Sequence, residues 1–285
     1  MDAETEERFP FGANWARFLE QIDESRIAAA VEALVAMLQS PSLAGQRFLD
    51  VGSGSGLSSL AAQRLGAVVH SFDFDPGSVA CTAELRRRYG AASGDWTVER
   101  GSALDAQYLE SLGEFDVVYS WGVLHHTGDL WTAMDLVARR VAPGGRLFVA
   151  IYNDQGPVSD RWKRIKRLYQ RLPRGLKTAL VILVGAGFWL RRLSAAGLSL
   201  LLRLLTLRNP LVPMQMLWTD LHVRNERGMH AWYDLVDWVG GWPFEVAQPE
   251  EVFRFLRDRG FVLREMTTCG GGLGCNQFVF DREKS

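Results

Sequence analysis

The sequence has few cysteines and lacks the spacing that metal ligands require. Only Cys81, Cys269 and Cys275 occur among 285 residues, and no histidines accompany them as in zinc sites. A disulfide scaffold and a structural metal site are therefore disfavoured, and no metal site is expected. We expect reduced thiols in a cytoplasmic protein.

The chain also shows little that would direct it into or through a membrane. Residues 1–8 are acidic and no apolar segment follows them, so no secretory signal peptide is expected. The longest apolar run, 178–190, would be about 20 Å long as a helix, whereas the hydrocarbon core of a bilayer is roughly 30 Å thick. A membrane-spanning helix is therefore not expected.

One long stretch lacks acidic residues altogether. Between Arg161 and Thr219 there are 12 Lys and Arg and no Asp or Glu, which leaves 20 basic residues to face 33 acidic ones elsewhere. The net charge of −1 thus conceals an acidic body and a basic, apolar segment. A uniformly basic nucleic-acid binder is excluded by this distribution.

The overall composition, with 47% hydrophobic and 23% charged residues, is typical of a folded globular protein. Apolar strands alternate with helical segments, which predicts a doubly wound, mostly parallel α/β sheet with an antiparallel strand at the C-terminus. The expected strands are 47–51, 68–72, 97–100, 115–120, 146–151, 261–267 and 276–280. The expected helices are 23–39, 57–65, one ending at Arg88, 130–141, 161–172, 178–190, 193–207 and 249–259.

The alternation is interrupted after the fifth strand, which predicts an insertion. We expect residues 1–156 to form a cofactor-binding core with an N-terminal helix and 246–285 to complete it. Residues 157–245 are expected to be mainly helical, and 161–208 holds the basic apolar part. Three roles remain open for it: a lid that selects a hydrophobic acceptor, an element that lies on an anionic membrane, or a core or homo-oligomer segment with a solvated basic face.

The sharpest local signal is the sequence Asp50-Val51-Gly52-Ser53-Gly54-Ser55-Gly56 between a strand and a helix. Such glycines let a ligand approach backbone N–H groups at a helix N-terminus. A dinucleotide fingerprint would need a glycine at Leu57, so that pattern fails. The Asp50 carboxylate would repel a pyrophosphate but attract the ammonium and sulfonium of S-adenosylmethionine. Asp73, about 20 residues further on, suits ribose hydroxyls.

These motifs resemble the class I S-adenosylmethionine-dependent methyltransferases, whose fold is Rossmann-like. The matching segments are 48–56, 71–75, 115–126 and 136–148, in the order that the class has, with a plausible continuation at 249–281. The resemblance implies a transferase that moves a methyl group from S-adenosylmethionine to a small or lipid-linked acceptor. The expected target is an oxygen atom of the acceptor, and nitrogen or carbon is the alternative.

The resemblance also implies roles for individual residues. Asp50, Gly52 and Gly54 would line the methionine moiety, Asp73 would hold the ribose, and Phe74 would flank the adenine. Ser102 stands where the class often has an acid that contacts the adenine amino group. Ser120 and Trp121 would pass close to the methyl donor. The full set of cofactor-binding candidates is Asp50, Gly52, Ser53, Gly54, Gly56, Asp73, Phe74, Ser102, Ala103 and Ser120.

Four histidines are candidates for a catalytic base. His125 and His126 follow the fourth strand, and His222 and His230 lie in the insertion. For each of them, an ordinary packing or hydrogen-bonding role is the alternative. The segment 234–245 is rich in tryptophan and acids, which suits a sugar, a ring or a cationic group, or else a packed cap.

Two classes of function remain open. The first is a methyltransferase with a small or lipid-linked acceptor, cytoplasmic or peripheral on a membrane. The second is a non-catalytic scaffold that keeps the cofactor fold and docks on a membrane or a partner. Nucleic acid is a minor alternative, because an Asn-Pro-Pro-Tyr type motif is absent after the fourth strand, where the chain reads Ser120-Trp121-Gly122-Val123.

Overall fold

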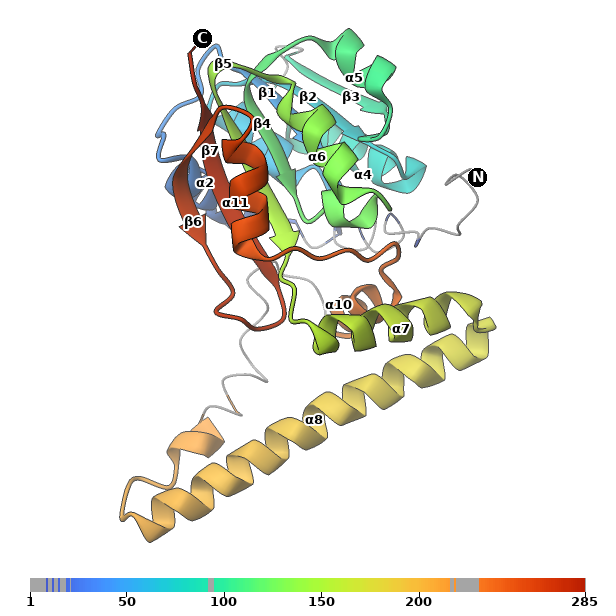
Figure 1. Cartoon of the computed structure of the whole chain (residues 1–285), viewed down its shortest axis with the longest axis vertical. Coiled ribbons are helices and arrows are strands. Elements are labelled where there is room, and N and C mark those ends of the chain that lie inside the picture. The colour runs from blue at the N-terminus through green and yellow to red at the C-terminus, as the bar shows by residue number, and fades with distance from the viewer. Residues whose placement is uncertain are drawn as a thin grey trace. The chain divides into compact units, whose positions relative to one another are not determined.

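A computed structural model of the chain describes residues 9, 12, 15, 19–20, 22–91, 95–215, 218 and 231–284 (Figure 1). The chain forms two compact units. The first joins Met1–Lys163 to Trp242–Ser285, and the second is Arg164–Gly241. The three-part domain division proposed above stays a prediction.

The first unit is built on a seven-stranded sheet with the order β3-β2-β1-β4-β5-β7-β6. All neighbouring pairs are parallel except those of β7, which runs antiparallel to both β5 and β6. This confirms the predicted doubly wound, mostly parallel α/β fold. The strands are β1 Arg47–Val51, β2 Val68–Asp73, β3 Trp96–Arg100, β4 Phe115–Trp121, β5 Val141–Tyr152, β6 Phe261–Thr267 and β7 Cys275–Arg282.

Strand β1 lies inside the sheet, between β2 and β4, and both of its faces are covered. Its last four residues are all buried, as expected for a strand between two helical layers. Asp50 is in register with Ser71 of β2 and with Tyr119 of β4. The carboxyl ends of these parallel strands therefore meet at one edge of the sheet, where α/β proteins bind ligands.

The helices of this unit begin at capping side chains. Asp75, Asp105 and Asp129 each accept a backbone N–H in the first turn of the helix that follows, and Gln248 and Glu251 form a capping box. The helices are α2 Glu24–Leu38, α3 Leu57–Arg64, α4 Pro76–Tyr89, α5 Ala106–Leu112, η2 Leu124–His126 (a 3₁₀ turn), α6 Leu130–Ala138, α7 Pro157–Arg171 (which continues into the second unit) and α11 Pro249–Arg257.

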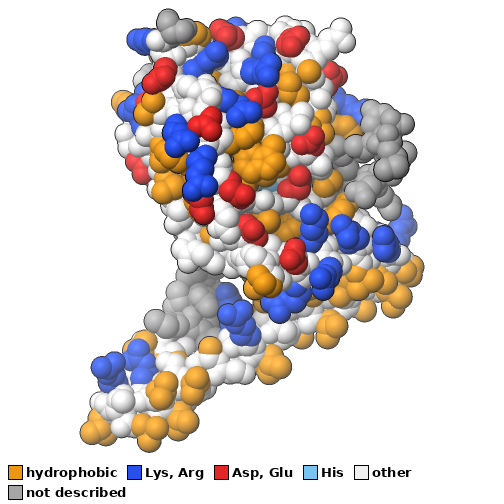
Figure 2. All heavy atoms as spheres, in the orientation of Figure 1, with side chains coloured by type: hydrophobic (Ala, Val, Ile, Leu, Met, Phe, Trp, Pro, Cys, Tyr) orange, Lys and Arg blue, Asp and Glu red, His pale blue; other side chains and the backbone are white. Residues whose placement is uncertain are grey.

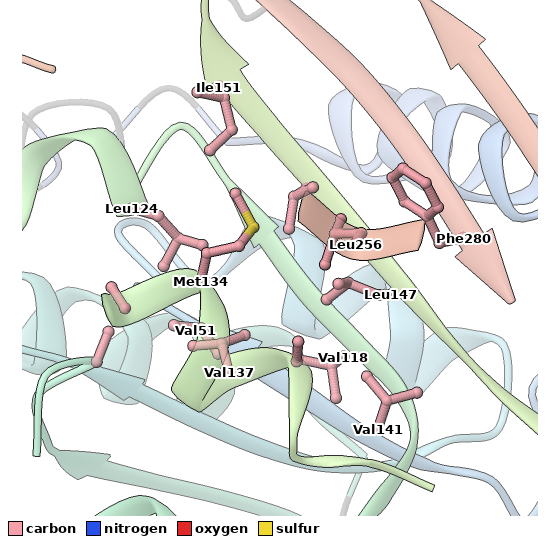
Figure 3. Packing of buried hydrophobic residues seen from close by; sticks show 14 of the residues in the cluster. Val51, Val118, Leu124, Met134, Val137, Val141, Leu147, Ile151, Leu256 and Phe280 are labelled. Carbon is pink, nitrogen blue, oxygen red and sulfur yellow. The ribbon is translucent and has the colours of Figure 1, made fainter. Parts of the chain in front are cut away.

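The main hydrophobic core lies between the sheet and helices α6 and α11. Met134 and Val137 of α6 are fully buried, as are Leu147 of β5 and Leu256 of α11. Figure 3 shows these side chains gathered on one face of the central strands. Helix–sheet packing of this kind is what the alternation of strands and helices predicts.

Two local predictions for this unit were wrong. Strand β5 begins at Val141 rather than at Arg146, because the segment 143–145 lies inside the strand as an irregularity instead of ending a helix. Its partner changes from Phe115↔Val141 to Val117↔Arg146 across this irregularity. Helix α5 was not predicted, because seven residues are too few for a clear helical period.

The second unit contains one long helix, α8, which spans Arg174–Leu205 without interruption. Two helices, 178–190 and 193–207, were predicted because Arg191 and Arg192 interrupt the apolar run, but arginine is a good helix former and does not break it. Its 32 residues are about 48 Å long. By length and composition α8 could cross a membrane, so the earlier objection from length no longer holds.

A buried lysine joins helix α7 to helix α10 in the second unit. Lys166 of α7 is fully buried, and its Nζ donates to the backbone carbonyl of Trp238 in α10 (Ala231–Gly240). Burial lowers the pKa of Lys166 to about 7, although nearby Asp237 opposes the shift. Helix α8 packs on the same assembly through Gly185, where an added Cβ would lie 2.7 Å from Leu235.

Candidate functional site

The glycine loop between β1 and α3 is shaped by backbone conformations that favour glycine. Gly52, Gly54 and Gly56 have φ angles of 78°, 55° and 81°. A Cβ on Gly52 would lie 2.4 Å from Val123, and one on Gly54 would lie 3.0 Å from the Trp15 ring. The Val123 and Trp15 side chains therefore pack directly on the loop backbone, so only glycine fits at Gly52 and Gly54.

Two side chains of this loop region brace the backbone. The hydroxyl groups of Ser53 and Thr82 lie 2.9 Å apart, and Thr82 Oγ1 also donates to the carbonyl of Gly54. The N–H groups of Gly52 and Ser53 both donate to the Phe72 carbonyl at the end of β2. The loop is thus tied to strand β2 and helix α4, which pre-organises it for a ligand.

Asp50 is buried beneath this loop. Ser59 Oγ donates to its carboxylate at 2.5 Å, the Ser71 hydroxyl lies 2.6 Å from Ser59 Oγ, and Trp96 Nε1 donates to Ser71 at 2.7 Å. Burial raises the pKa of Asp50 to about 7, and the bond from Ser59 opposes the rise. A cation bound nearby would stabilise the ionised form of this carboxyl and lower its pKa again.

Asp73 ends β2 directly beside the glycine loop. Its carboxylate accepts the N–H of Gly54 and that of Asp75, both at 2.9 Å. Burial raises its pKa to about 6, against the effect of these hydrogen bonds. Phe74 follows with its ring 44% exposed and the Arg100 guanidinium 5.6 Å from the ring centroid. A carboxylate beside an exposed ring suits a ribose and an adenine.

Ser102 and Ala103 follow β3 at the same edge of the sheet. The N–H of Gly101 donates to the carbonyl of Asp73, so the ends of β2 and β3 stay joined. Ser102 Oγ accepts the N–H of Leu104. A Cβ on Gly101 would lie 2.3 Å from the Tyr108 ring, which explains glycine at that position. These residues therefore border the region next to Phe74.

Ser120 is placed differently from the expectation. Strand β4 extends through Trp121, so both residues lie within the strand and not after it. Ser120 is fully buried, and its hydroxyl donates to the carbonyl of Val51 at 3.2 Å. Its side chain thus links β4 to β1. Trp121 is partly exposed, and its Nε1 donates to Gln277 of β7.

The paired histidines lie in the turn η2, immediately after β4. Val123, two residues before His125, contacts the glycine loop as described above. The Tyr152 N–H donates to His125 Nδ1 at 3.3 Å, and His125 is fully buried. His126 is partly exposed, and its Nδ1 lies 2.5 Å from the Pro243 carbonyl. Because a carbonyl can only accept, Nδ1 of His126 carries the proton, and its lone pair is at Nε2 when the ring is neutral.

Aromatic rings from three parts of the chain meet at these histidines. The Tyr152 ring, at the end of β5, lies 3.8 Å from that of His125 and 5.5 Å from those of His126 and Phe244. Glu245 then accepts the N–H groups of Gly128 and Leu130, and burial raises its pKa. Trp242 and Phe244 are also buried, so this end of the aromatic and acidic segment is a packed cap.

An open pocket of about 260 Å³ adjoins this cap. It lies within the first unit, where the chain leaves β5 and begins α7. Its walls combine acids, a lysine and apolar atoms, which allows hydrogen bonds to a polar ligand. The lining residues are Asp154, Gly156, Ser159, Asp160, Lys163, Phe244, Glu245 and Val246.

Sequence reasoning missed the contribution of the N-terminal segment. The N–H of Gly12 donates to Asp75 Oδ2 at 2.6 Å, and Trp15 lies against Gly54. The N–H of Phe9 donates to the carbonyl of Trp242. No sequence motif identifies these contacts, because they join residues far apart in the chain. Of the other candidates, His222 and His230 lie outside the described residues.

The described residues offer no group of three or more His, Cys, Asp or Glu that could hold a metal ion. Cys81, Cys269 and Cys275 form no disulfide in the described part of the chain. The candidate site consists of the glycine loop, the carboxyls of Asp50 and Asp73, whose pKa values are raised, and the histidine turn η2. These parts all lie at the edge of the sheet where the parallel strands β1, β2 and β4 end.

A known domain family, described as a methyltransferase domain, matches residues 49–149. Together with the fold and the loop, this identifies residues 49–149 as a domain of the class I S-adenosylmethionine-dependent methyltransferase type. S-adenosylmethionine is the cofactor of that class, which confirms the predicted class of protein and its cofactor.

Among curated proteins, the chain is 37% identical over 112 residues to a ubiquinone biosynthesis O-methyltransferase of Xylella fastidiosa (strain M23), covering 39% of this chain and 44% of the relative. The enzyme of the same name from Xanthomonas oryzae pv. oryzae (strain PXO99A) is 36% identical over 111 residues, covering 39% and 45%. The chain thus spans less than half the length of the curated relatives it matches.

Solved structures share the fold over nearly the whole chain. Magnesium protoporphyrin IX methyltransferase from Synechocystis PCC 6803, with bound S-adenosylhomocysteine, has a TM-score of 0.53 at 15% identity, covering 95% of this chain and 94% of that one. N-methyltransferase NodS from Bradyrhizobium japonicum WM9, also with that product, has a TM-score of 0.50 at 13% identity, covering 96% and 99%.

Proposed function

We propose that the protein methylates an oxygen atom of a small hydroxylated acceptor. The observation that carries this proposal is the His126 ring, whose Nδ1–H is held by the Pro243 carbonyl. It belongs to the turn in which Val123 packs against Gly52. The names of the curated relatives, which are O-methyltransferases, support oxygen as the atom that is methylated.

The residues present fit S-adenosylmethionine. The glycine loop leads into the N-terminus of α3, whose dipole favours the carboxylate group of the methionine moiety. The buried Asp50 carboxyl, with its raised pKa, gains from the positive charge of the methionine end. Asp73 and Phe74 suit the ribose and the adenine. When bound, the cofactor supplies an activated methyl group.

An alcohol or phenol must lose its proton as the new bond forms. S-adenosylmethionine, held by Asp50, Asp73 and the glycine loop, would supply the methyl carbon to the acceptor oxygen, and its sulfur would keep the electrons of the carbon–sulfur bond. The proton of the hydroxyl passes to Nε2 of His126, while the Pro243 carbonyl holds Nδ1–H and so fixes the ring. His125 is fully buried and packed on Tyr152, so it supports the turn instead.

The open pocket next to Phe244 is the proposed acceptor subsite. The residues that follow β5 line this pocket, and β5 ends at the same edge of the sheet as the strand before the glycine loop. Asp154 and Glu245 can accept hydrogen bonds from acceptor hydroxyl groups, and Lys163 can donate one to an anionic or carbonyl group. This lining favours an acceptor with several oxygens over a purely apolar one.

The test measures product formation from S-adenosylmethionine with a panel of phenols and matched aromatic amines. His126→Ala should lower kcat by about 10²- to 10⁴-fold while the affinity for S-adenosylhomocysteine stays within about twofold. The pH profile of kcat should lose its acidic limb in this variant. Methylation of the amines alone would contradict oxygen transfer.

The control is His70→Gln, on β2, where the histidine pairs with Glu99. That variant should keep the wild-type kcat, because His70 lies in the opposite half of the sheet from β5. An unchanged kcat in His126→Ala would overturn the assignment of the base. Cofactor binding without turnover of any acceptor would favour the scaffold class instead.

A further inference from the structure

We infer that α8 docks the protein on an anionic lipid bilayer, lying in the plane of the headgroups with its leucine-rich face in the membrane. This inference concerns a surface of the second unit and does not depend on the proposed methyl transfer. It commits to a membrane of anionic lipids as the partner.

The first observation is the exposure of apolar side chains along α8. Leu183, Leu190 and Leu205 are 69%, 67% and 73% exposed. Figure 2 shows hydrophobic side chains gathered along this helix. Isolated exposed leucines are ordinary, but a continuous apolar face of this length marks a contact surface. Further members of this face, all more than half exposed, are Leu176, Ile182, Leu193, Leu198, Leu201 and Leu204.

The second observation is where the charges of α8 lie. A helix advances about 100° per residue, so Arg174 and Arg192 lie within about 20° of the buried Val181. Lys177 and Arg203 lie within about 40° of it, and Arg191 about 80°. The side that carries Val181 also packs on the other helices, since Gly185 meets Leu235 and Lys177 Nζ lies 5.2 Å from the Tyr169 ring.

The opposite side of α8 carries no charge at all. Leu183, Leu190 and Leu201 lie about 160° to 180° from Val181, which places them on one line along the helix. A surface helix of a water-soluble domain has the reverse arrangement, with its apolar stripe inward and its charges outward. The outward side of α8 therefore matches an apolar environment, and the basic side matches lipid headgroups.

The charge of the unit identifies the kind of partner. Arg164, Arg167 and Arg171 of α7 are exposed, as are Arg191 and Arg192 of α8, and 161–219 contains no acid. Juxtamembrane cations of this kind bind anionic headgroups. A second copy of the chain would bring two such basic units together, and like charges oppose that contact. Trp189, 42% exposed, suits the interface between headgroups and acyl chains.

The same charges argue against a helix that crosses the bilayer. In such an arrangement Arg191 and Arg192, near the middle of α8, would lie deep in the hydrocarbon, where arginine is costly. With α8 parallel to the surface, the same side chains reach the headgroups while the leucines enter the acyl boundary.

The test is co-sedimentation of the full chain with vesicles of phosphatidylcholine alone or of equal parts phosphatidylcholine and phosphatidylglycerol. We expect binding to the anionic vesicles only, weakening as salt is raised. Leu183→Ser with Leu190→Ser should lower the vesicle affinity more than tenfold. Arg191→Gln with Arg192→Gln should lower it about fivefold per arginine.

The matched controls are substitutions of the same type at exposed residues of the first unit. Val262→Ser removes an exposed apolar side chain from β6, and Arg257→Gln removes an exposed cation from α11, and both should bind like the wild type. Circular dichroism and S-adenosylhomocysteine binding verify that each variant folds. Because the leucines and arginines are exposed, their replacement leaves the packing of the unit intact.

Three results would overturn the inference. The first is a wild-type chain that stays in the supernatant with anionic vesicles, or leucine variants that bind as well as it does. The second is a dimer in lipid-free sedimentation velocity that the leucine variants abolish, with no vesicle binding, which would make a second copy the partner. The third is membrane-bound protein that resists extraction by alkaline carbonate, which would indicate a spanning helix.

Discussion

The two units of the molecule distribute apolar residues in opposite ways. In the first unit, Phe278 and Phe280 of β7 are fully buried within the sheet core, whereas in the second Leu183 and Leu190 of α8 face outward. Both units are rich in leucine and valine, so composition alone does not separate them. The difference shows that the first unit is complete in water, whereas the second presents a surface suited to another environment.

The largest expected contrast comes from removing one large side chain from each unit. Phe280→Ala should lower the free energy of unfolding by about 3–5 kcal/mol, because it leaves a cavity in the core. Leu190→Ala should change it by less than about 0.5 kcal/mol, because that side chain is already in solvent. Urea denaturation followed by circular dichroism measures both. Equal losses in the two variants would mean that the face of α8 is covered in solution.

A second contrast compares glycines of the two units. Gly52→Ala should weaken S-adenosylhomocysteine binding more than tenfold in calorimetry, because the new Cβ meets Val123 and φ is 78°. Gly187→Ala in α8 meets nothing within 4 Å and should leave binding unchanged, while raising helix stability by up to about 1 kcal/mol. Normal affinity in Gly52→Ala would exclude the loop as the cofactor cradle.

A third contrast is in the dependence of stability on pH, and it has opposite signs in the two units. The pKa of Asp50 rises from 3.8 to about 7 on folding, so the folded protein binds more protons between these values and stability falls as pH rises. The pKa of Lys166 falls from 10.5 to about 7, so stability rises with pH across that window.

Each slope is at most about 1.4 kcal/mol per pH unit, the value for one proton. Asp50→Asn should remove the fall between pH 4 and 7, and Lys166→Met should remove the rise between pH 7 and 10.5. Urea titrations at a series of pH values provide the measurement. A slope that persists in its own variant would assign it to another group.

The parts of the fold that depend on neighbouring residues could be predicted from the sequence. The buried run of β1, the glycine loop and Asp73 all follow from short patterns of residue type. The continuity of α8 could not, because Arg191 and Arg192 interrupt its hydropathy without interrupting the helix. The start of β5 was also misjudged, since Pro143 and the glycines after it usually end an element.

The site was predictable only where one segment supplies it. The bond from Ser59 to Asp50, and that between Ser59 and Ser71, depend on strand register and on the packing of α3. The bond between His126 and the carbonyl of Pro243 joins residues that are 117 positions apart. Such pairs are set by the tertiary structure, which is why four histidines remained equal candidates in the sequence.

The position of β7 between β5 and β6 has a consequence for how the protein forms during synthesis. Strand β5 obtains its second neighbour only from residues Cys275–Arg282, which leave the ribosome after the whole of the second unit. Strand β6 also cannot pair until β7 has been synthesised, because β7 is its one neighbour within the described sheet. The long helix α8 is therefore fully translated while the edge of the nascent sheet at β5 is still open. It can thus contact other molecules before the sheet of the first unit is complete.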